Sequence, residues 1–268
     1  MELASIKRIF SGEKSVEPLV QKVSGNGQGY MSNRPQNADQ KIKFLTFERD
    51  ILKEAEDLAG AGGTEVLSVL RRLGLDGFSR LMWSLPISDY PQLSKILPRM
   101  TELPVQAKWT GQSGLPLMVQ SISFVRAVAD DYSRLTGRTL NDATMLDFGC
   151  GYGRFLRLMT YYSDPDNVHG CDPLEASLDQ CRSCDIPNAL KLSDYVPGTL
   201  PFPDKTFDFA FAFSVFTHTS GHAMKAALKA LRLAVKDDGV LAITIRPEEY
   251  WNINPVYAKR AEALIEAH

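Results

Sequence analysis

The sequence predicts an α/β fold, in which a doubly wound, mostly parallel sheet follows a helical N-terminal extension. After residue 114, short apolar runs alternate with stretches of helical periodicity, and a glycine-rich turn joins the first run to the next helix. The 268 residues, 44% of them hydrophobic, are enough for one large domain plus an extension. Strands that alternate with helices indicate right-handed βαβ units and a parallel sheet covered on both faces.

The alternating segments follow a helix whose apolar face runs from Met118 to Leu135, with Gly137 as its C-terminal cap. Ligands of such sheets bind beyond the carboxyl ends of the strands. The predicted strands are 143–148, 167–172, 188–193, 207–213 and 239–245, and the predicted helices between them are 152–162, 174–184 and 222–235.

The region before this domain divides into two parts. Residues 1–38 lack sustained periodicity and are rich in Gly, Asn, Ser and Gln, which predicts a flexible tail or arm. Residues 39–113 form the predicted helical extension or cap, which shows no residues with evident chemistry and suits a homo-oligomer contact or another partner. Its expected parts are a first helix up to Leu58, a second helix over 66–73 that ends at Gly74, and short helices and turns in the proline-containing stretch 85–104.

Composition excludes several classes of function. With 30 Lys+Arg against 32 Asp+Glu, the chain carries a net charge of −2, whereas a dedicated nucleic-acid binder has a basic domain. No run approaches 18 apolar residues, so no membrane span is expected, and the first residues lack the apolar core of a signal peptide. Four cysteines are too few for a disulfide framework, which indicates a reduced, cytoplasmic setting.

The turn at residues 146–154, LDFGCGYGR, is the most informative stretch of the chain. Its glycines are spaced G-x-G-x-G, and Arg154 stands where a dinucleotide-binding fingerprint has its third glycine. Asp147 ends the preceding strand, where a carboxylate suits a ligand with an ammonium and a sulfonium better than a pyrophosphate. Asp172 closes the second predicted strand, where a carboxylate can accept two hydrogen bonds from a ribose diol.

With these features the chain resembles the class I S-adenosylmethionine-dependent methyltransferases over roughly residues 114–247. The resemblance implies a Rossmann-like sheet of strand order 3-2-1-4-5. It also implies the cofactor S-adenosyl-L-methionine and the product S-adenosyl-L-homocysteine. The motifs that carry the resemblance are LDFGCGYG (146–153), GCDP (170–173), LSDY (192–195), PFPDKTFDFAFAFSVFTH (201–218) and LKALRLAVKDDGVLAITI (228–245).

The resemblance also implies roles at the methionine end of the cofactor. Asp147 would order the methionine ammonium, directly or through water. The other residues implied to line the cofactor at this end are Gly149, Cys150, Gly151, Phe213 and Ser214.

At the nucleoside end, the resemblance implies that Asp172 holds the ribose hydroxyls, with Pro173 and Leu174 against the adenine. Asp194 would accept a hydrogen bond from the adenine amino group, with Tyr195 beside it. For each of these residues the alternative is a helix cap or a turn residue. That alternative is strongest for Asp194, because a loop with Pro and Gly follows it.

Methyl transfer requires the acceptor to be aligned and, where the acceptor is a hydroxyl, a base to remove its proton. His218, just past the fourth predicted strand, is the candidate catalytic base, since an ordinary imidazole has a pKa of about 6.5. The alternative is a loop histidine that caps the following helix. His222, in the first turn of that helix, is the weaker candidate.

The sequence favours a hydroxyl acceptor on a small molecule or a sugar. No Asn-Pro-Pro-Tyr motif follows the fourth strand, where residues 213–216 read Phe-Ser-Val-Phe, and no Pro-Cys pair for cytosine methylation occurs. Residues 67–86 and 105–114 resemble an N-terminal extension of bacterial methyltransferases from glycan or secondary-metabolite pathways. Within that extension, Trp109 either closes over the cofactor or fills the core.

Cys181 and Cys184, with Cys150 and Cys171 nearby, allow a zinc site or four buried thiols. Structural zinc sites normally have paired ligand spacing, whereas here one pair falls within a predicted helix and the other two cysteines end strands. We therefore expect buried thiols and no metal.

Two other functions remain open. The resembled family adds a helix and two antiparallel strands after the fifth strand, and this chain ends within what looks like that helix, at 255–268. The domain 114–268 is thus expected to lack its last two strands, which allows a non-catalytic scaffold whose residues 1–110 bind a partner. An NAD-dependent oxidoreductase is disfavoured by the glycine spacing and by Asp147.

Overall fold

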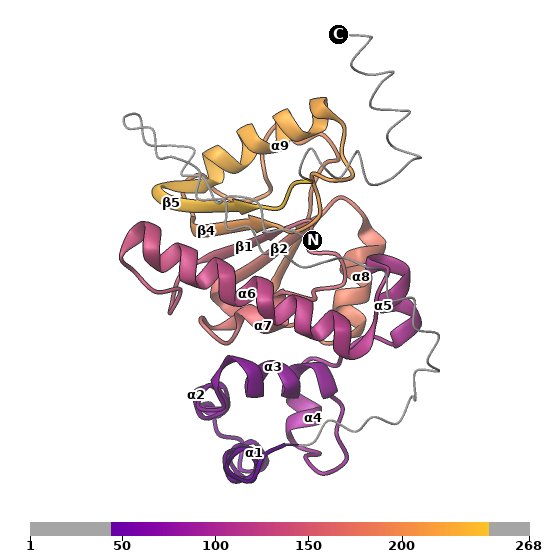
Figure 1. Ribbon diagram of the computed structural model, residues 1–268, viewed down its shortest axis with the longest axis vertical. Coiled ribbons are helices and arrows are strands. Elements are labelled where there is room, and N and C mark those ends of the chain that lie inside the picture. Colours follow the sequence, from indigo (N-terminus) through magenta and orange to yellow (C-terminus); the bar gives the residue numbers. More distant parts are fainter. Residues whose placement is uncertain (1–43, 247–268) are drawn as a thin grey trace, which may run out of the picture.

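The computed structural model describes residues 44–246, which fold around a five-stranded sheet (Figure 1). All neighbouring strands pair in parallel, and the order β3-β2-β1-β4-β5 confirms the predicted topology. The predicted tail 1–38 and the predicted C-terminal helix 255–268 lie outside the described residues. The strands are β1 (Met145–Phe148), β2 (Val168–Asp172), β3 (Ala189–Leu192), β4 (Phe207–Ala212) and β5 (Val235–Ile243).

Alternating side chains give the sheet two hydrophobic faces. Phe209 and Phe211 of β4 belong to the core under α6, α7 and α8, whereas Ala210 and Ala212 belong to the core under α9. Helices therefore cover both faces, and α9 lies on the opposite side of the sheet from α6 and α7 (Figure 1). These helices are α6 (Gly114–Thr136), α7 (Leu156–Met159), α8 (Glu175–Ser183) and α9 (Gly221–Ala234), with a short 3-10 turn η1 (Pro165–Asn167) before β2.

The N-terminal helices form a further layer that packs on α6 and α7 (Figure 1). One continuous cluster of buried side chains extends from Leu52 of α1 and Phe78 of α3 through Val125 of α6 to the sheet. Phe78 meets Tyr161 edge to face, with ring centroids 5.5 Å apart. The layer consists of α1 (Thr46–Gly60), α2 (Val66–Arg71), α3 (Gly74–Ser84) and α4 (Leu93–Ile96), and α5 (Leu103–Thr110) leads from it to the start of α6 (Figure 1).

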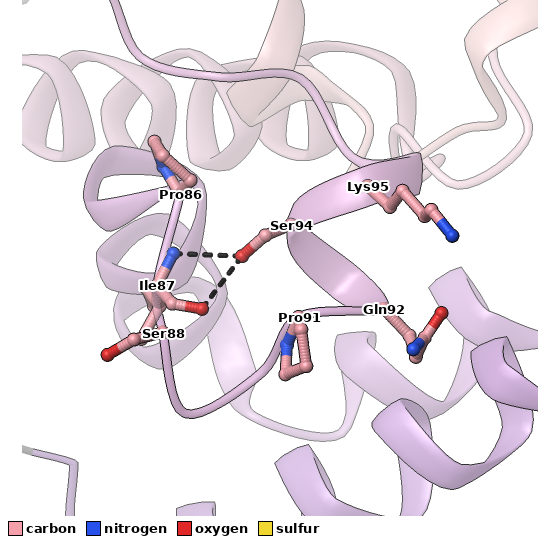
Figure 2. Close-up of a pocket in the computed structure, with 7 residues that line it drawn as sticks. All are labelled: Pro86, Ile87, Ser88, Pro91, Gln92, Ser94 and Lys95. Carbon is pink, nitrogen blue, oxygen red and sulfur yellow. Dashed lines mark hydrogen bonds between the residues drawn. The ribbon is translucent and has the colours of Figure 1, made fainter.

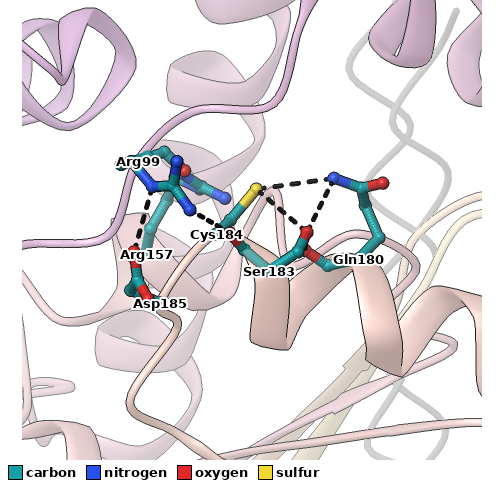
Figure 3. A network of polar contacts seen from close by, with 6 residues as sticks. All are labelled: Arg99, Arg157, Gln180, Ser183, Cys184 and Asp185. Carbon is teal, nitrogen blue, oxygen red and sulfur yellow. Dashed lines mark hydrogen bonds and ion pairs between the residues drawn. The ribbon is translucent and has the colours of Figure 1, made fainter.

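A polar network joins this layer to the sheet domain (Figure 3). Nε of Arg99 donates to Oδ2 of Asp185 at 3.0 Å, and its guanidinium also donates to the carbonyl of Ser183 at the end of α8. The fully buried Arg157 donates to the carbonyl oxygens of Arg99 at 2.7 Å and of Gly153 at 3.2 Å. One guanidinium thus ties the N-terminal layer to the turn after β1.

Two predicted helices are wrong in their extent. The second helix was expected to reach Gly74, but α2 ends at Arg71 and Gly74, with φ +71°, begins the separate helix α3. The helix expected over 152–162 is reduced to α7, because Gly153 has φ +73° and extends the turn. A positive φ is not helical, so each glycine ends or resets the helix around it.

Other boundaries agree more closely with the sequence. Gly137 has φ +71°, and its N–H donates to the carbonyl of Ser133 at 2.8 Å, which confirms it as the cap of α6. The fifth strand begins at Val235 instead of residue 239, because α9 ends at Ala234 and leads directly into it. Phe207 of β4 pairs with Val235 and Phe209 pairs with Val240, so a register shift between these two pairs accommodates the extra residues of β5. Within residues 44–246 no helix is both long and apolar enough to cross a bilayer.

Because the two layers share one core, we expect Phe78→Ala to destabilise the whole molecule. Phe78 is fully buried, so the loss should be about 3–5 kcal/mol in the free energy of unfolding. Urea unfolding followed by circular dichroism and by tryptophan emission should show one transition that moves as a unit. Phe47→Ala, at a side chain that is 56% exposed, is the control. Two separable transitions, with only one of them shifted, would contradict the shared core.

Candidate functional site

The turn after β1 is shaped by three glycines and held by the end of β2. Gly149, Gly151 and Gly153 have φ of +78°, +55° and +73°, in the region that favours glycine. The N–H groups of Gly149 and Cys150 both donate to the carbonyl of Cys171, at 2.8 and 3.1 Å. The turn therefore brings its backbone to the carboxyl edge of the sheet at positions that carry no side chain of their own.

The loop after β4 packs directly against this turn. A Cβ built on Gly149 would lie 2.4 Å from Cγ2 of Val215, a distance that no real contact allows. Alanine at Gly149 would thus combine backbone strain with a collision.

Asp147 is the buried acid of the site. It lies at the end of β1, beside Gly170 of β2 and Phe211 of β4, and is 2% exposed. Its Oδ2 atom is buried without a hydrogen-bond partner. Burial raises the pKa of Asp147 to about 8; Arg154 opposes this shift and Asp172 adds to it. When such an unpartnered buried carboxyl group ionises, a cationic group of a ligand would stabilise it.

Asp172 already makes three hydrogen bonds within the protein. Its Oδ2 accepts from the N–H of Gly151 at 3.0 Å, and its Oδ1 accepts from the N–H of Leu174 and the hydroxyl of Ser177, both at 2.9 Å. The carboxylate therefore positions the glycine turn and the start of α8. Since a carboxylate has about four acceptor sites, Oδ2 retains capacity for a ligand hydroxyl.

The predicted nucleoside residues line the edge next to Asp172. Pro173 and the 43%-exposed Leu174 precede α8, while Asp194 and Tyr195 follow β3. Tyr195 is 65% exposed, and in the described part of the chain no hydrogen bond fixes the Asp194 or Tyr195 side chain. Their contact with an adenine stays a prediction.

Phe213 and Ser214 leave the end of β4 toward the turn. Ser214 has φ +61°, and its N–H donates to Oγ1 of Thr244 at 2.6 Å, which fixes the start of the loop. The Phe213 ring packs against Phe124 and Phe155, with centroids 4.7 and 5.0 Å away. The aromatic cluster thus supports the floor of the site.

His218 is exposed on the loop between β4 and α9. It is not the cap of α9, because Oγ of Ser220 accepts from the N–H of Ala223 at 3.2 Å and fills that role. His222, in the first turn of α9, is also exposed. The capping alternative for His218 is therefore wrong.

Arg154, directly after the glycine turn, is a buried charge to which sequence reasoning assigned no role. Its side chain is 8% exposed, and the guanidinium lies over the rings of Phe155 and Phe213, at 4.4 and 4.8 Å from their centroids. Its Nη1 donates to Oε1 of Gln120 on α6 at 3.1 Å. A charged residue directly after a glycine turn was the available signal, but the sequence did not show which way it points.

Trp109 of α5 lies over the glycine turn. A Cβ built on Gly151 would lie 3.7 Å from Cε3 of the indole, and the ring meets Tyr152 edge to face at 6.4 Å. The indole is 36% exposed, so it covers the turn instead of filling the core. The N-terminal layer thus contributes a side chain to the site.

All four cysteines are buried free thiols, as predicted. The Cys150 side chain lies against Gly170, and Cys181 donates to the carbonyl of Gly151 at 3.2 Å. Burial raises the pKa of Cys171 to about 12. Between residues 44 and 246, no three His, Cys, Asp or Glu side chains gather as metal ligands.

A separate hollow of about 440 Å³ lies in the N-terminal layer, away from the glycine turn (Figure 2). Ser94 holds its wall by accepting from the N–H of Ile87 at 2.8 Å and donating to the Ile87 carbonyl at 3.0 Å. Lys95 is the one charged residue of its lining. Among the described residues, no acid, histidine or cysteine lines this hollow.

Residues 146–243 match the family model of a methyltransferase domain. These residues, less than half of the chain, are similar to a methyltransferase domain, and their strands have the order of the predicted Rossmann-like sheet. They include the glycine turn, Asp147 and Asp172, whereas Trp109 and Gln120 lie before them. None of the curated proteins compared with the chain matches it.

Several solved structures are similar to the chain. DesVI of Streptomyces venezuelae is 21% identical, with 44% of this chain and 48% of DesVI aligned at a TM-score of 0.37. CalS10, an amino pentose methyltransferase from Micromonospora echinaspora with SAM bound, is 22% identical over 56% and 60%, at 0.43. PKMT2 from Rickettsia typhi, in complex with AdoHcy, is 21% identical over 46% and 25%, at 0.39. The chain spans 48% of the length of DesVI and 60% of that of CalS10.

The residues at the turn of the methyltransferase domain fit S-adenosyl-L-methionine, the cofactor of this family. The unpartnered Oδ2 of Asp147 can accept from the methionine ammonium, and the glycines let the backbone approach the ligand. A pyrophosphate beside that carboxylate would be repelled once the group is ionised.

We expect Asp147→Asn to remove a pH-dependent loss of stability. The pKa of Asp147 is about 8 when folded and about 3.9 when unfolded, so the folded state binds the extra proton between these values. The proton bound by Asp147 stabilises the folded state fully below pH 4. This contribution to the free energy of unfolding declines by up to about 1.4 kcal/mol per pH unit as the pH rises through 8. Urea unfolding of the ligand-free protein from pH 5 to 9 measures this slope.

The slope should be smaller in Asp147→Asn than in the native chain. Asp194→Asn, at an exposed carboxylate, serves as the control and should keep the native slope. Parallel stability curves for the native chain and Asp147→Asn would show that the buried carboxyl group does not titrate as described.

Proposed function

We propose that this protein is an S-adenosylmethionine-dependent methyltransferase that methylates a hydroxyl of a small molecule or a sugar. The observation that carries this proposal is the buried Asp147, whose Oδ2 has no protein partner and adjoins the glycine turn. The ionised form of this buried group would be stabilised by a cationic ligand group, and the methionine ammonium of the cofactor would supply one.

In this proposal the cofactor lies across the carboxyl ends of β1 and β2. Asp147 receives the ammonium, with Gly149 and Gly151 along the methionine chain, and Asp172 receives a ribose hydroxyl at its remaining acceptor site. The turn supports this assignment, because the Asp172 carboxylate accepts from the N–H of Gly151 and so fixes the ribose subsite relative to the methionine subsite. Pro173, Leu174, Asp194 and Tyr195 would face the adenine.

The bound cofactor supplies a methyl group already activated by its sulfonium, so the chain mainly aligns the acceptor. Trp109 covers the turn and excludes water from one side of it. His218, exposed on the loop after β4, is free to take the proton of an acceptor hydroxyl that enters at the carboxyl edge.

A hydroxyl acceptor fits the residues after β4. An amino methyltransferase of the Asn-Pro-Pro-Tyr type would need amide and aromatic groups there, whereas this chain has Phe213, Ser214 and Val215. A small molecule or saccharide from bacterial glycan or secondary-metabolite pathways is the proposed acceptor class. The four free thiols fit a reducing, cytoplasmic compartment.

Calorimetric titration with S-adenosylhomocysteine and, separately, with NAD tests the cofactor. We expect binding of S-adenosylhomocysteine alone, with a stabilisation of about 2.7 kcal/mol at one hundred times its Kd. Asp172→Asn should weaken binding at least about tenfold, because the amide nitrogen would face the Gly151 N–H. Asp179→Asn, at an exposed carboxylate of α8, is the matched control.

The possible results separate the three functions. Binding of NAD without S-adenosylhomocysteine would replace the proposal by an oxidoreductase. Tight binding of S-adenosylhomocysteine without turnover of S-adenosylmethionine on any hydroxyl acceptor would favour a scaffold.

His218→Ala should lower the rate of methyl transfer by about 10²- to 10⁴-fold and leave the Kd of S-adenosylhomocysteine unchanged. The expected reason is loss of the proton acceptor, while the cofactor subsites stay intact. His222→Ala is the matched control, since it lies four residues away and is equally exposed. An unchanged rate in His218→Ala would remove the base from the mechanism.

A further inference from the structure

Helix α5 lies beside the candidate site but adds no side chain to the core. Gln106 is its one buried residue, whereas α6 buries a whole face. Among the residues that the structure describes, no apolar side chain of α5 belongs to either core cluster or packs against one. Segments with few buried apolar contacts open at a low cost in free energy. α5 can therefore detach without disrupting the core.

One buried amide closes the segment that contains α5. Gln106 is 2% exposed; its Nε2 donates to the carbonyl of Thr101 at 2.8 Å, and its Oε1 accepts from the N–H of Gly114 at 2.9 Å. Nε2 of Gln180 on α8 donates to Oγ1 of Thr101 at 3.0 Å, which fastens one end of the segment to the sheet domain. The two ends of residues 101–114 are thus joined through a single side chain.

The backbone after α5 has the freedom that a hinge needs. Gly111 and Gly114 have φ of +75° and +63°, and glycine adopts either sign of φ without strain. A Cβ built on Gly111 would meet no atom within 4 Å, so packing does not restrain this position. Figure 1 shows α5 at the edge of the molecule, beside α8, where nothing drawn beyond it would block an outward movement.

Trp109 makes α5 an obstacle to a ligand of the glycine turn. A Cβ built on Gly151 would be in ordinary contact with the indole, 3.7 Å from Cε3 and 3.9 Å from Cζ3. At this point only one layer of carbon atoms fits between the turn and the ring. The direct route to the backbone of the turn is therefore closed while the ring stays in place.

We propose that residues 101–114 form a lid, which Gln106 latches closed and which opens to admit S-adenosylmethionine and to release S-adenosylhomocysteine. This inference rests on the proposed function. It makes Gln106 a positioning residue, because the two hydrogen bonds of its amide set how often the lid opens. Such lids control the entry and release of ligands in many enzymes.

Hydrogen exchange measured on peptides tests the motion. A detached helix of eight residues is unstable in water, so opening exposes its amides. In the ligand-free protein, residues 103–110 should exchange at least about a hundredfold faster than residues 117–132 of α6. Saturating S-adenosylhomocysteine should slow exchange in 103–110 at least about tenfold, while α2, the control, stays unchanged. Equal protection of α5 and α6, or no slowing of α5 by the bound ligand, would overturn the inference.

The latch has a kinetic signature of its own. Gln106→Met removes both amide hydrogen bonds and keeps a side chain of similar length, so the closed lid loses these bonds whether or not a ligand is bound. The association and dissociation rate constants of S-adenosylhomocysteine should therefore rise together by roughly 10- to 100-fold, while the Kd stays within about twofold. Surface plasmon resonance measures both rates. Gln112→Met, at an exposed glutamine just after α5, is the matched control.

A rise in the dissociation rate alone would show that Gln106 only supports a ligand contact, and unchanged rates would show that it is no latch. Either result overturns the inference. The hydrogen-exchange comparison uses the native protein, so it decides the question even if Gln106→Met does not fold. Failure of the native protein to bind S-adenosylhomocysteine in calorimetry would instead refute the proposed function on which the inference rests.

Discussion

The site depends on the attachment of the turn after β1 to the end of β2. One carbonyl, that of Cys171, receives two N–H groups of the turn, and the Asp172 carboxylate receives a third from Gly151. These bonds require the positive φ angles that glycine adopts without strain. The same turn follows Asp147, so these bonds also fix the backbone next to the buried carboxyl group.

Local sequence patterns were enough to predict the parts of the fold that depend on local chemistry. The five apolar runs form strands of one parallel sheet, as their alternation with helices predicted, and they pair in the order that the family resemblance implied. Gly137 caps α6 because a glycine after an apolar periodic run is the residue that tolerates the left-handed conformation. Asp147 and Asp172 became candidates through their place at strand ends beside the glycine turn, and Asp172 also has a structural role there.

Other features were set by packing between distant segments and could not be predicted. The start of α3 at Gly74 depends on burying Phe78 against Tyr161, about eighty residues further along the chain. The orientation of Arg154 depends on two aromatic rings and on Gln120. The exposure of Trp109 above the turn follows from the docking of α5, for which periodicity carries no information.

The position of Trp109 has an optical consequence. An indole that is partly exposed and lies against the glycine turn emits from a medium whose polarity changes when water there is displaced. Trp83, by contrast, is buried in the core of the N-terminal layer and is shielded from such a change. Between residues 44 and 246 the protein therefore carries one tryptophan at the candidate site and one buried away from it.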